Sequence, residues 1–432
     1  MQQYSPEHLA GVWGRIRNHA VTGRARETAV GVDGVRGAVF ERNLYNNLAE
    51  ISRTVLRDGD DGLPCYMFAP LLCHEKLKTN GGVRNIHIAR MRDQIVLRAM
   101  HEDIVGSAAP KGLDLTTAPP SKAVAAFRSA LDTDCIVVRG DVAEFFDSVP
   151  RAKVVERALG LPLGPLTCGL LQKWTERVVV RPAWVAGKES DKSVQGLPQG
   201  LSLSASLAEL WASQIDEEAR RARLAYFRYV DDISIVCNSL REAEDALDWL
   251  VAATRRIDLR LSPSKTGISR ITEGVPWLGL THYSDKVVAS PDRPHRWLKR
   301  FAALRRDAAM AIANHSADKT EILAAFHRAV RDEITGRTSS RPAWYAVVSD
   351  EGEWRRMDRS LHAFIRSLHR QAGAPPPTGR QLPSLHRAIA SRRTRLSAPS
   401  NADKGPCATH HRKVEKNADQ GHKAPDGAEL FN

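Results

Sequence analysis

Residues 225–237 of the 432-residue chain read AYFRYVDDISIVC, with two short apolar runs on either side of an aspartate pair. Short runs of β-branched and aromatic residues are typical of strands, so this stretch predicts a tight hairpin. Adjacent residues of a strand point to opposite faces of the sheet. Asp231 and Asp232 therefore converge on one site only if they occupy the turn between the two strands.

A third carboxylate follows an apolar run further upstream. Residues 135–149 read CIVVRGDVAEFFDSV, which predicts a buried strand that reaches Asp141. Carboxylates beside apolar strands are costly to bury without compensation. Divalent cations would supply the missing charge, and hard oxygen ligands suit Mg²⁺. Two such ions can activate an attacking hydroxyl and stabilise a leaving pyrophosphate. The simpler alternative is an Asp-Asp turn whose charges are solvated.

Helical and strand patterns alternate around these carboxylates. A Gly- and Pro-containing loop at 195–201 opens a long helical pattern. The hairpin is followed by a helical pattern over 240–257 and then by a further short strand pattern. The order of strand, helix, helix, hairpin, helix and strand predicts an α+β domain with an antiparallel sheet.

The composition narrows the class of protein. The chain has 63 Lys and Arg against 50 Asp and Glu, a formal net charge of +13, and 42% of its residues are apolar. The apolar share is enough to bury a core, and the positive excess indicates a polyanionic partner such as nucleic acid. The six cysteines form no CxxC pair, which argues against a zinc ribbon. Without a secretory signal or an apolar stretch of about 20 residues, we expect a cytoplasmic protein with no membrane contact.

Five motifs occur in a set order: DVAEFFDS from Asp141, then QGLPQGLSLSASLAEL, YVDD, SPSKTG and WLGL. In this order they resemble the motifs of the reverse transcriptase family. GVDGV at 31–35 and GGVRNIHIARMRDQIV at 81–96 look like the N-terminal extension and fingers motifs of group II intron and related bacterial enzymes. The resemblance covers about residues 28 to 285. It implies a right-hand fold with fingers, an antiparallel-sheet palm and a helical thumb.

The resemblance also implies roles for the residues of the catalytic centre. Asp141, Asp231 and Asp232 match the family's catalytic carboxylates. Together with Val142 they would hold two Mg²⁺ ions, with Mn²⁺ as an alternative. Lys265 matches a lysine near the leaving phosphates, although a lysine in a turn is ordinarily solvated. A protonated amine at that point could neutralise the departing pyrophosphate.

Further matches concern the nucleotide and the nucleic acid. Arg84 stands at the position that contacts the triphosphate, and Gln199 and Gly200 match a loop beside the incoming nucleotide and template. The basic helix near residue 300 is expected to bind nucleic acid; the alternative is that its charged face is only solvated. The residues expected to bind nucleic acid are Trp277, Leu278 and Gly279 of the primer-grip hairpin, and Arg296, Lys299 and Arg300 of the thumb.

Phe146 stands five residues after Asp141, where the family carries an aromatic steric gate against a ribose 2′-hydroxyl. A bulky ring beside the metal site leaves little room at the sugar. The period-two alternation of a strand allows only one of Phe145 and Phe146 to point inward. We favour Phe146 as the gate, with Phe145 in the core, and therefore expect deoxynucleotide addition.

These features divide the chain into four parts and define its partners. They are an N-terminal extension and fingers (1–134), a palm with fingers insertions (135–285), a helical basic thumb (286–371) and a tail (372–432). The tail is rich in Pro, Ser and charge, so we expect it to be disordered. The expected partners are an RNA template, a DNA product and deoxynucleoside triphosphates, and the question of an oligomer stays open.

Departures from known subgroups favour one kind of reverse transcriptase. There is no CxxC endonuclease, no Asn-Ala-x-x-His segment of the retron type, and the loop motif keeps Gln199-Gly200. By exclusion the chain resembles the defence-associated bacterial enzymes, which include abortive-infection types and several that use a non-coding RNA. A mobile-element or retron-type enzyme without endonuclease is the first alternative, and a scaffold with a polymerase fold is the second.

Overall fold

The computed structural model describes residues 3–19, 30–77, 82–116, 119–176, 179–182, 192–193, 196–290, 292–314, 318–335, 348–349, 351–378 and 382–388. Most of the predicted tail, residues 389–432, lies outside them. The helices of at least eight residues are α1 (Pro6–His19), α4 (Leu44–Leu56), α5 (Met91–Ala108), α6 (Pro120–Ser129), α8 (Arg151–Leu159), α9 (Pro165–Glu176), α10 (Ser202–Arg221), α11 (Leu240–Arg256), α12 (Asp292–Ala313), α13 (Lys319–Thr335) and α15 (Glu351–Ala372).

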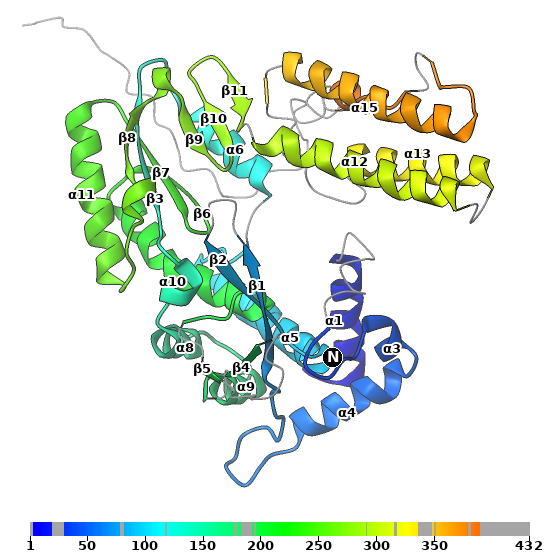
Figure 1. The fold of residues 1–432 in the computed structure, drawn as a ribbon. Coiled ribbons are helices and arrows are strands. Elements are labelled where there is room, and N and C mark those ends of the chain that lie inside the picture. Colours follow the sequence, from blue (N-terminus) through cyan, green and yellow to red (C-terminus); the bar gives the residue numbers. More distant parts are fainter. Residues whose placement is uncertain are drawn as a thin grey trace, which may run out of the picture.

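An antiparallel sheet, which we call the central sheet, lies beside α11 (Figure 1). This central sheet has the order β6 (Ala225–Tyr229), β7 (Asp232–Cys237), β3 (Ile136–Asp141) and β8 (Gly267–Arg270). A two-residue turn, with Val230 at a φ of 58°, joins β6 to β7. The predicted hairpin, the strand that ends at Asp141 and the antiparallel sheet are confirmed.

The two faces of the central sheet pack into different hydrophobic cores. Val138 and Ile235 point to one side, where α10 and α11 cover the sheet. Val137 and Val236 point to the other side, toward α6 and the small sheet of β9 (Val275–Trp277), β10 (Leu280–His282) and β11 (Val287–Ala289). Strand residues alternate between faces, so each strand supplies both cores.

A second sheet, which we call the outer sheet, has the order β2 (Val83–Ile88), β1 (Leu71–Leu77), β4 (Val179–Pro182) and β5 (Lys192–Ser193). β1 pairs antiparallel with β2 and parallel with β4. In Figure 1 this sheet lies between the central sheet and the N-terminal helices α1 and α4. Its strands β1 and β2 belong to the segment 1–134 that is predicted to form the N-terminal extension and fingers.

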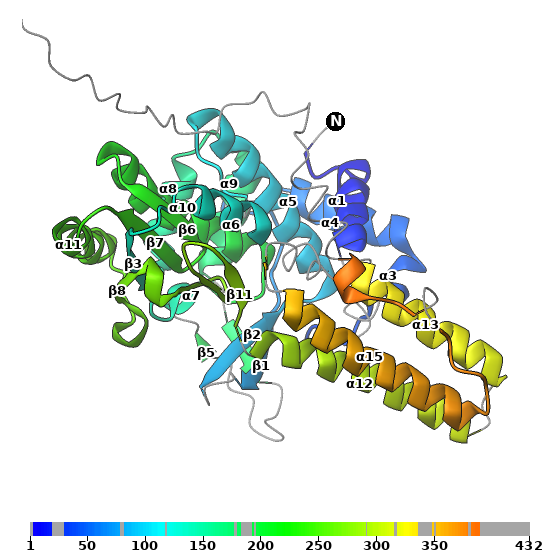
Figure 2. The ribbon, with the colours of Figure 1, turned by 90° about the horizontal axis from the view of Figure 1, so that it is seen from above.

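Helices α12, α13 and α15 form a group that projects from the body of the molecule (Figure 2). The rings of Trp297 on α12 and Trp354 on α15 meet edge to face, with centroids 6.2 Å apart, and both are buried. Asp358 on α15 accepts hydrogen bonds from Ser384 Oγ and the Leu385 amide, both at 2.6 Å. Leu385 is itself buried. Residues 382–388 thus pack against α15, within the segment predicted as the tail.

No helix in the described part of the chain is long and apolar enough to cross a membrane.

The small sheet encloses a buried imidazole. His282 of β10 is 0% exposed, and its ring lies 5.1 Å from the ring of Phe127. Burial lowers the pKa of His282 to about 4, and the charge of Arg128 acts in the same direction. The neutral form is therefore the one that fits the folded protein.

We expect His282 to make the fold less stable in mild acid. Between pH 6.5 and 4 the unfolded imidazole binds a proton that the folded one does not, so the free energy of unfolding falls as pH falls. The loss attributable to this residue is about 2 kcal/mol between pH 7 and pH 5. The contribution of His282 is measured by urea unfolding of the parent and of His282→Phe at pH 7 and pH 5. All other titrating groups are common to the two proteins, so the difference between their pH dependences belongs to His282. An identical pH dependence in the two proteins would contradict this assignment.

Candidate active site

Three carboxylates gather at one end of the central sheet. Asp141, the last residue of β3, is paired across the strands with Asp232, the first residue of β7. Directly paired residues of antiparallel strands point to the same face, so both side chains lie on the face that carries the small sheet. The Val142 amide donates to the Asp231 carbonyl at 3.0 Å, which ties the end of β3 to the turn. The sequence-based expectation that these residues converge matches this geometry.

The carboxylates lie in surroundings that disfavour their charge. Burial raises the pKa of Asp232 to about 7, and the charges of Asp141 and Asp231 add to the rise, against the opposing charge of Arg139. Burial and the charge of Asp141 also raise the pKa of Asp231. The charges of Lys265 and Arg84 oppose that rise. The centre therefore carries negative charge that the surrounding cations only partly offset.

Lys265 binds one of these carboxylates directly. Its Nζ donates to Oδ1 and Oδ2 of Asp141 at 2.8 and 3.0 Å. The Ser262 amide donates to the Asp141 carbonyl at 2.7 Å, which fixes the start of the turn that presents the lysine. Lys265 therefore belongs to the candidate centre rather than to solvent alone, although about half of its side chain is exposed.

The donor chemistry of this centre suits a hard divalent cation. Carboxylate oxygens are the ligands that Mg²⁺ prefers, and the raised pKa values of Asp231 and Asp232 reflect charge that a cation would offset. Within the described residues, however, no three His, Cys, Asp or Glu side chains stand as a ready set of metal ligands. The Lys265 ammonium holds Asp141 instead. Val142 has a buried side chain, so it could offer only its backbone carbonyl.

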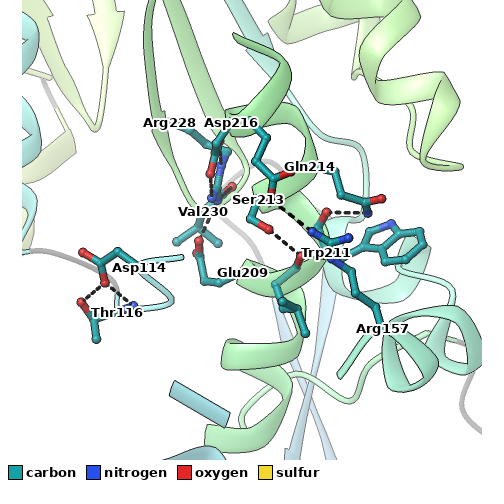
Figure 3. A network of polar contacts seen from close by, with 12 residues as sticks. Asp114, Thr116, Arg157, Glu209, Trp211, Ser213, Gln214, Asp216, Arg228 and Val230 are labelled. Carbon is teal, nitrogen blue, oxygen red and sulfur yellow. Dashed lines mark hydrogen bonds and ion pairs between the residues drawn. The ribbon is translucent and has the colours of Figure 1, made fainter. Parts of the chain in front are cut away.

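A buried arginine supports the aspartate turn from the other face (Figure 3). Arg228 of β6 donates to both carboxylate oxygens of Asp216 at 2.6 and 2.8 Å and to Glu209 at 2.8 Å, both on α10. It also donates to the Val230 carbonyl at 3.0 Å. Its side chain is only 8% exposed, so the two carboxylates are needed to compensate its charge.

Sequence reasoning missed this support. The signal was available, because Arg228 interrupts an apolar strand two residues before the turn. A buried cation requires partners. Glu209 and Asp216 are seven residues apart on α10, which places both on one helical face.

The loop at 196–200 connects the aspartate-containing segment to the outer sheet. The Leu197 amide donates to the Phe146 carbonyl at 2.8 Å, and the His87 amide of β2 donates to the Gln199 carbonyl at 2.7 Å. Gly200 has a φ of 113°, and a Cβ there would lie 2.7 Å from the His87 carbonyl oxygen. The loop therefore requires glycine at this point.

The two phenylalanines after Asp141 do not lie on a strand. β3 ends at Asp141, and Phe145–Ser148 forms the one-turn helix α7, so the alternation used to separate the two rings was the wrong geometry. Phe145 is nonetheless a core residue, 4% exposed, whereas Phe146 is only partly buried. The ring centroids lie 5.7 Å apart.

Residues 76–282 match the family model for reverse transcriptase (RNA-dependent DNA polymerase). These residues form a reverse transcriptase domain. The match runs from β1 to β10 and so includes the carboxylates, Lys265 and the 196–200 loop. The match supports RNA-directed DNA polymerase activity, which is a nucleotidyltransferase activity. No curated protein matches the chain.

Arg84 lies on the strand of the reverse transcriptase domain that the loop contacts. It is exposed on β2, opposite Lys76 of β1. Its charge opposes the raised pKa of Asp231, which places the guanidinium within electrostatic range of the carboxylates. Lys78, the other lysine before the turn, lies outside the described residues.

The predicted primer-grip hairpin adjoins the carboxylates, but one of its residues is a core residue. Trp277 is 1% exposed and packs against Phe127 with ring centroids 4.7 Å apart, so its ring does not face nucleic acid. Leu278 and Gly279 form the turn between β9 and β10, with φ values of 51° and 70°. The Leu278 amide donates to Asp232 Oδ2 at 3.4 Å. The hairpin thus contacts the centre through its turn.

The predicted basic residues of the C-terminal part lie on α12. Lys299 is exposed, and Arg300 forms an ion pair with Glu333 of α13 at 3.8 Å. The Arg296 side chain lies outside the described residues. Their contact with nucleic acid stays a prediction.

We expect Gly200→Ala to impair the reverse transcriptase domain. An alanine at φ 113° is strained, and its Cβ would push the loop away from β2, at a stability cost of about 1–3 kcal/mol. Gly267→Ala is the matched control, because a Cβ there meets nothing within 4 Å and its φ is not left-handed. Primer extension and thermal unfolding of both variants test this. Equal effects of the two substitutions would show that the loop contact is unimportant.

Proposed function

We propose that the chain is a reverse transcriptase of right-hand design that adds deoxynucleotides with two divalent cations. The central sheet would be its palm, the outer sheet its fingers and helices α12, α13 and α15 its thumb. The pairing of Asp141 with Asp232 beside Asp231 is the observation that supports this proposal most directly.

In this proposal the oxygen donors bind the metal ions, and the cationic side chains contact the phosphates. Asp141, Asp231, Asp232 and the Val142 carbonyl would hold Mg²⁺, or Mn²⁺, which when bound supplies the charge that activates a 3′-hydroxyl and stabilises pyrophosphate. Lys265 would release Asp141 and place its ammonium beside the departing pyrophosphate, where it can neutralise the developing charge or donate a proton. Outside this group, Arg84 would bind the triphosphate from the side of the outer sheet, with Gln199 and Gly200 next to the nucleotide.

We further propose a role in anti-phage defence, with a non-coding RNA as template or partner. Its support is the set of sequence departures from group II intron and retron enzymes, together with the Gln199-Gly200 of the loop motif. The mobile-element enzyme and the nucleic-acid scaffold remain the alternatives. The three carboxylates and their supporting arginine are all in place, which weighs against a scaffold alone.

We expect Asp231→Ala and Asp232→Ala each to abolish Mg²⁺-dependent DNA synthesis, because each removes an oxygen donor that nothing else replaces. Asp248→Ala removes an exposed carboxylate from α11 and should leave synthesis unchanged. The measurement is primer extension on an RNA template, together with plating efficiency of phage on cells that express each variant. Retained DNA synthesis would refute the catalytic assignment, whereas lost synthesis with full protection would favour the scaffold.

We expect Phe146→Val to relax sugar selection. Shortening the ring opens space at the ribose without removing a carboxylate, so ribonucleotide incorporation should rise relative to deoxynucleotide incorporation. The loss of a large partly buried side chain costs about 1–3 kcal/mol, so thermal unfolding is followed in parallel.

Phe145→Val is the comparison for this test. Its ring is in the core, so stability should fall with no change in the sugar ratio. If Phe146→Val folds and discriminates as strongly as the parent, Phe146 is not the gate.

A further inference from the structure

A basic pocket lies beside α10, where α8 packs against that helix. It has a volume of about 500 Å³, and its lining comes from the end of η1 (Ala109–Lys111), from α8, from the residues that follow each of them, and from α10. α8 and α10 lie side by side in both views (Figures 1 and 2). Its charged lining residues are Lys111, Arg157, Glu217, Arg220 and Arg221.

This pocket does not share a face with the carboxylates. Asp141 and Asp232 point to the face of the small sheet, whereas α10 covers the opposite face. Along α10 itself, the Arg228 network uses Glu209 and Asp216, whereas the pocket is lined by Leu210, Glu217, Arg220 and Arg221. The pocket is therefore separate from the candidate active site.

Three of the pocket cations, Arg157, Arg221 and Lys111, make specific contacts. Arg157 of α8 donates to the Leu210 carbonyl at 3.2 Å and to Glu217 at 3.3 Å, and Arg221 reaches the other oxygen of Glu217 at 3.6 Å. Lys111 donates to the Gly160 carbonyl at 2.8 Å. One carboxylate thus orients two guanidinium groups from two helices. Four cations against one carboxylate leave a net positive lining.

We propose that this basic pocket binds the phosphate backbone of RNA outside the active site. Guanidinium groups match phosphate oxygens in charge and geometry. Among the described residues that line the pocket there is no aromatic ring on which a base could stack, since its apolar floor consists of leucines. The lining therefore suits a backbone rather than a nucleobase. The formal net charge of +13 favours the same polyanion.

This proposal rests on the proposed function, because an enzyme that copies RNA must hold a template much longer than the segment in its active site. A contact behind the central sheet would anchor a folded part of that RNA while another part is copied. The other reading of these cations is that they offset the negative ends of α8 and α10, near which Arg157, Arg220 and Arg221 stand.

Arg220→Gln/Arg221→Gln tests the proposal. We expect the affinity for a long structured RNA to fall at least about fivefold at 0.1 M salt, and the slope of log affinity against log salt to lose about 1 for each phosphate contact. Extension of a short primer–template should keep the parental rate. Arg241→Gln/Arg255→Gln removes the same charge from exposed positions of α11, outside the pocket. It should leave the salt slope unchanged. If the double variant fails to fold, Arg221→Gln alone replaces it in the same measurements, because the Arg221 side chain is 76% exposed and its loss should not affect folding.

Four outcomes would overturn the proposal. They are an unchanged RNA affinity and salt slope, an equal loss in the α11 control, lower thermal stability without an RNA effect, and displacement of RNA by a single nucleotide at sub-millimolar concentration. The third would mean that the cations only offset the helix ends, and the fourth that a small effector binds here. RNA binding is measured by anisotropy without added metal or nucleotide, so its result does not depend on DNA synthesis. If the parent protein extends no primer, the proposed function is contradicted. If the pocket variant nonetheless binds RNA more weakly than the parent, the proposal for the pocket stands.

Discussion

The pairing of β3 with β7 is the constraint on which the candidate active site depends. With Asp141 opposite Asp232, two carboxylates point to one face, and the turn that follows β6 adds the third. A register slip of one residue would send Asp141 to the face covered by α10 and separate the pair. The apolar residues of β3 prevent such a slip, because Val137 and Val138 are both fully buried in different cores. The chemistry of the site is thus placed by packing on both faces of the sheet.

That placement brings three carboxylates close together, and three cationic side chains partly offset their negative charge. Lys265 binds Asp141, the charge of Arg139 acts on Asp232, and the charge of Arg84 acts on Asp231 from the outer sheet. The pKa values of Asp231 and Asp232 nonetheless remain raised by burial. Arg228 does not offset the charge of these three aspartates, because its own charge is already compensated by Asp216 and Glu209 on the other face of the sheet. It supports the backbone of the turn instead.

Much of this arrangement could be predicted from the sequence, since the deciding signals are local. The two apolar runs of 225–237 and the apolar run before Asp141 predict the hairpin, the strand and an antiparallel sheet. Longer-range packing was harder to foresee. The strand pattern was extended through Phe145 and Phe146, although the chain turns into a short helix after Asp141. Trp277 was assigned to nucleic acid from a resemblance, but only the fold shows that Phe127, 150 residues earlier, buries its ring. Arg228 passed unnoticed because its partners lie on a different element.

The loop at 196–200 shows how two distant parts of the site are made to act together. One of its amides binds the carbonyl of Phe146, the residue proposed to contact the sugar, and its Gln199 carbonyl binds the strand that carries Arg84. Both contacts use the backbone, so they require a close approach rather than a particular side chain. Glycine at Gly196 and Gly200 permits that approach, since a Cβ at either position would collide with a facing carbonyl. A displacement of β2 would therefore be transmitted through the loop to the helical turn of Phe146, which couples the proposed phosphate and sugar contacts of one nucleotide.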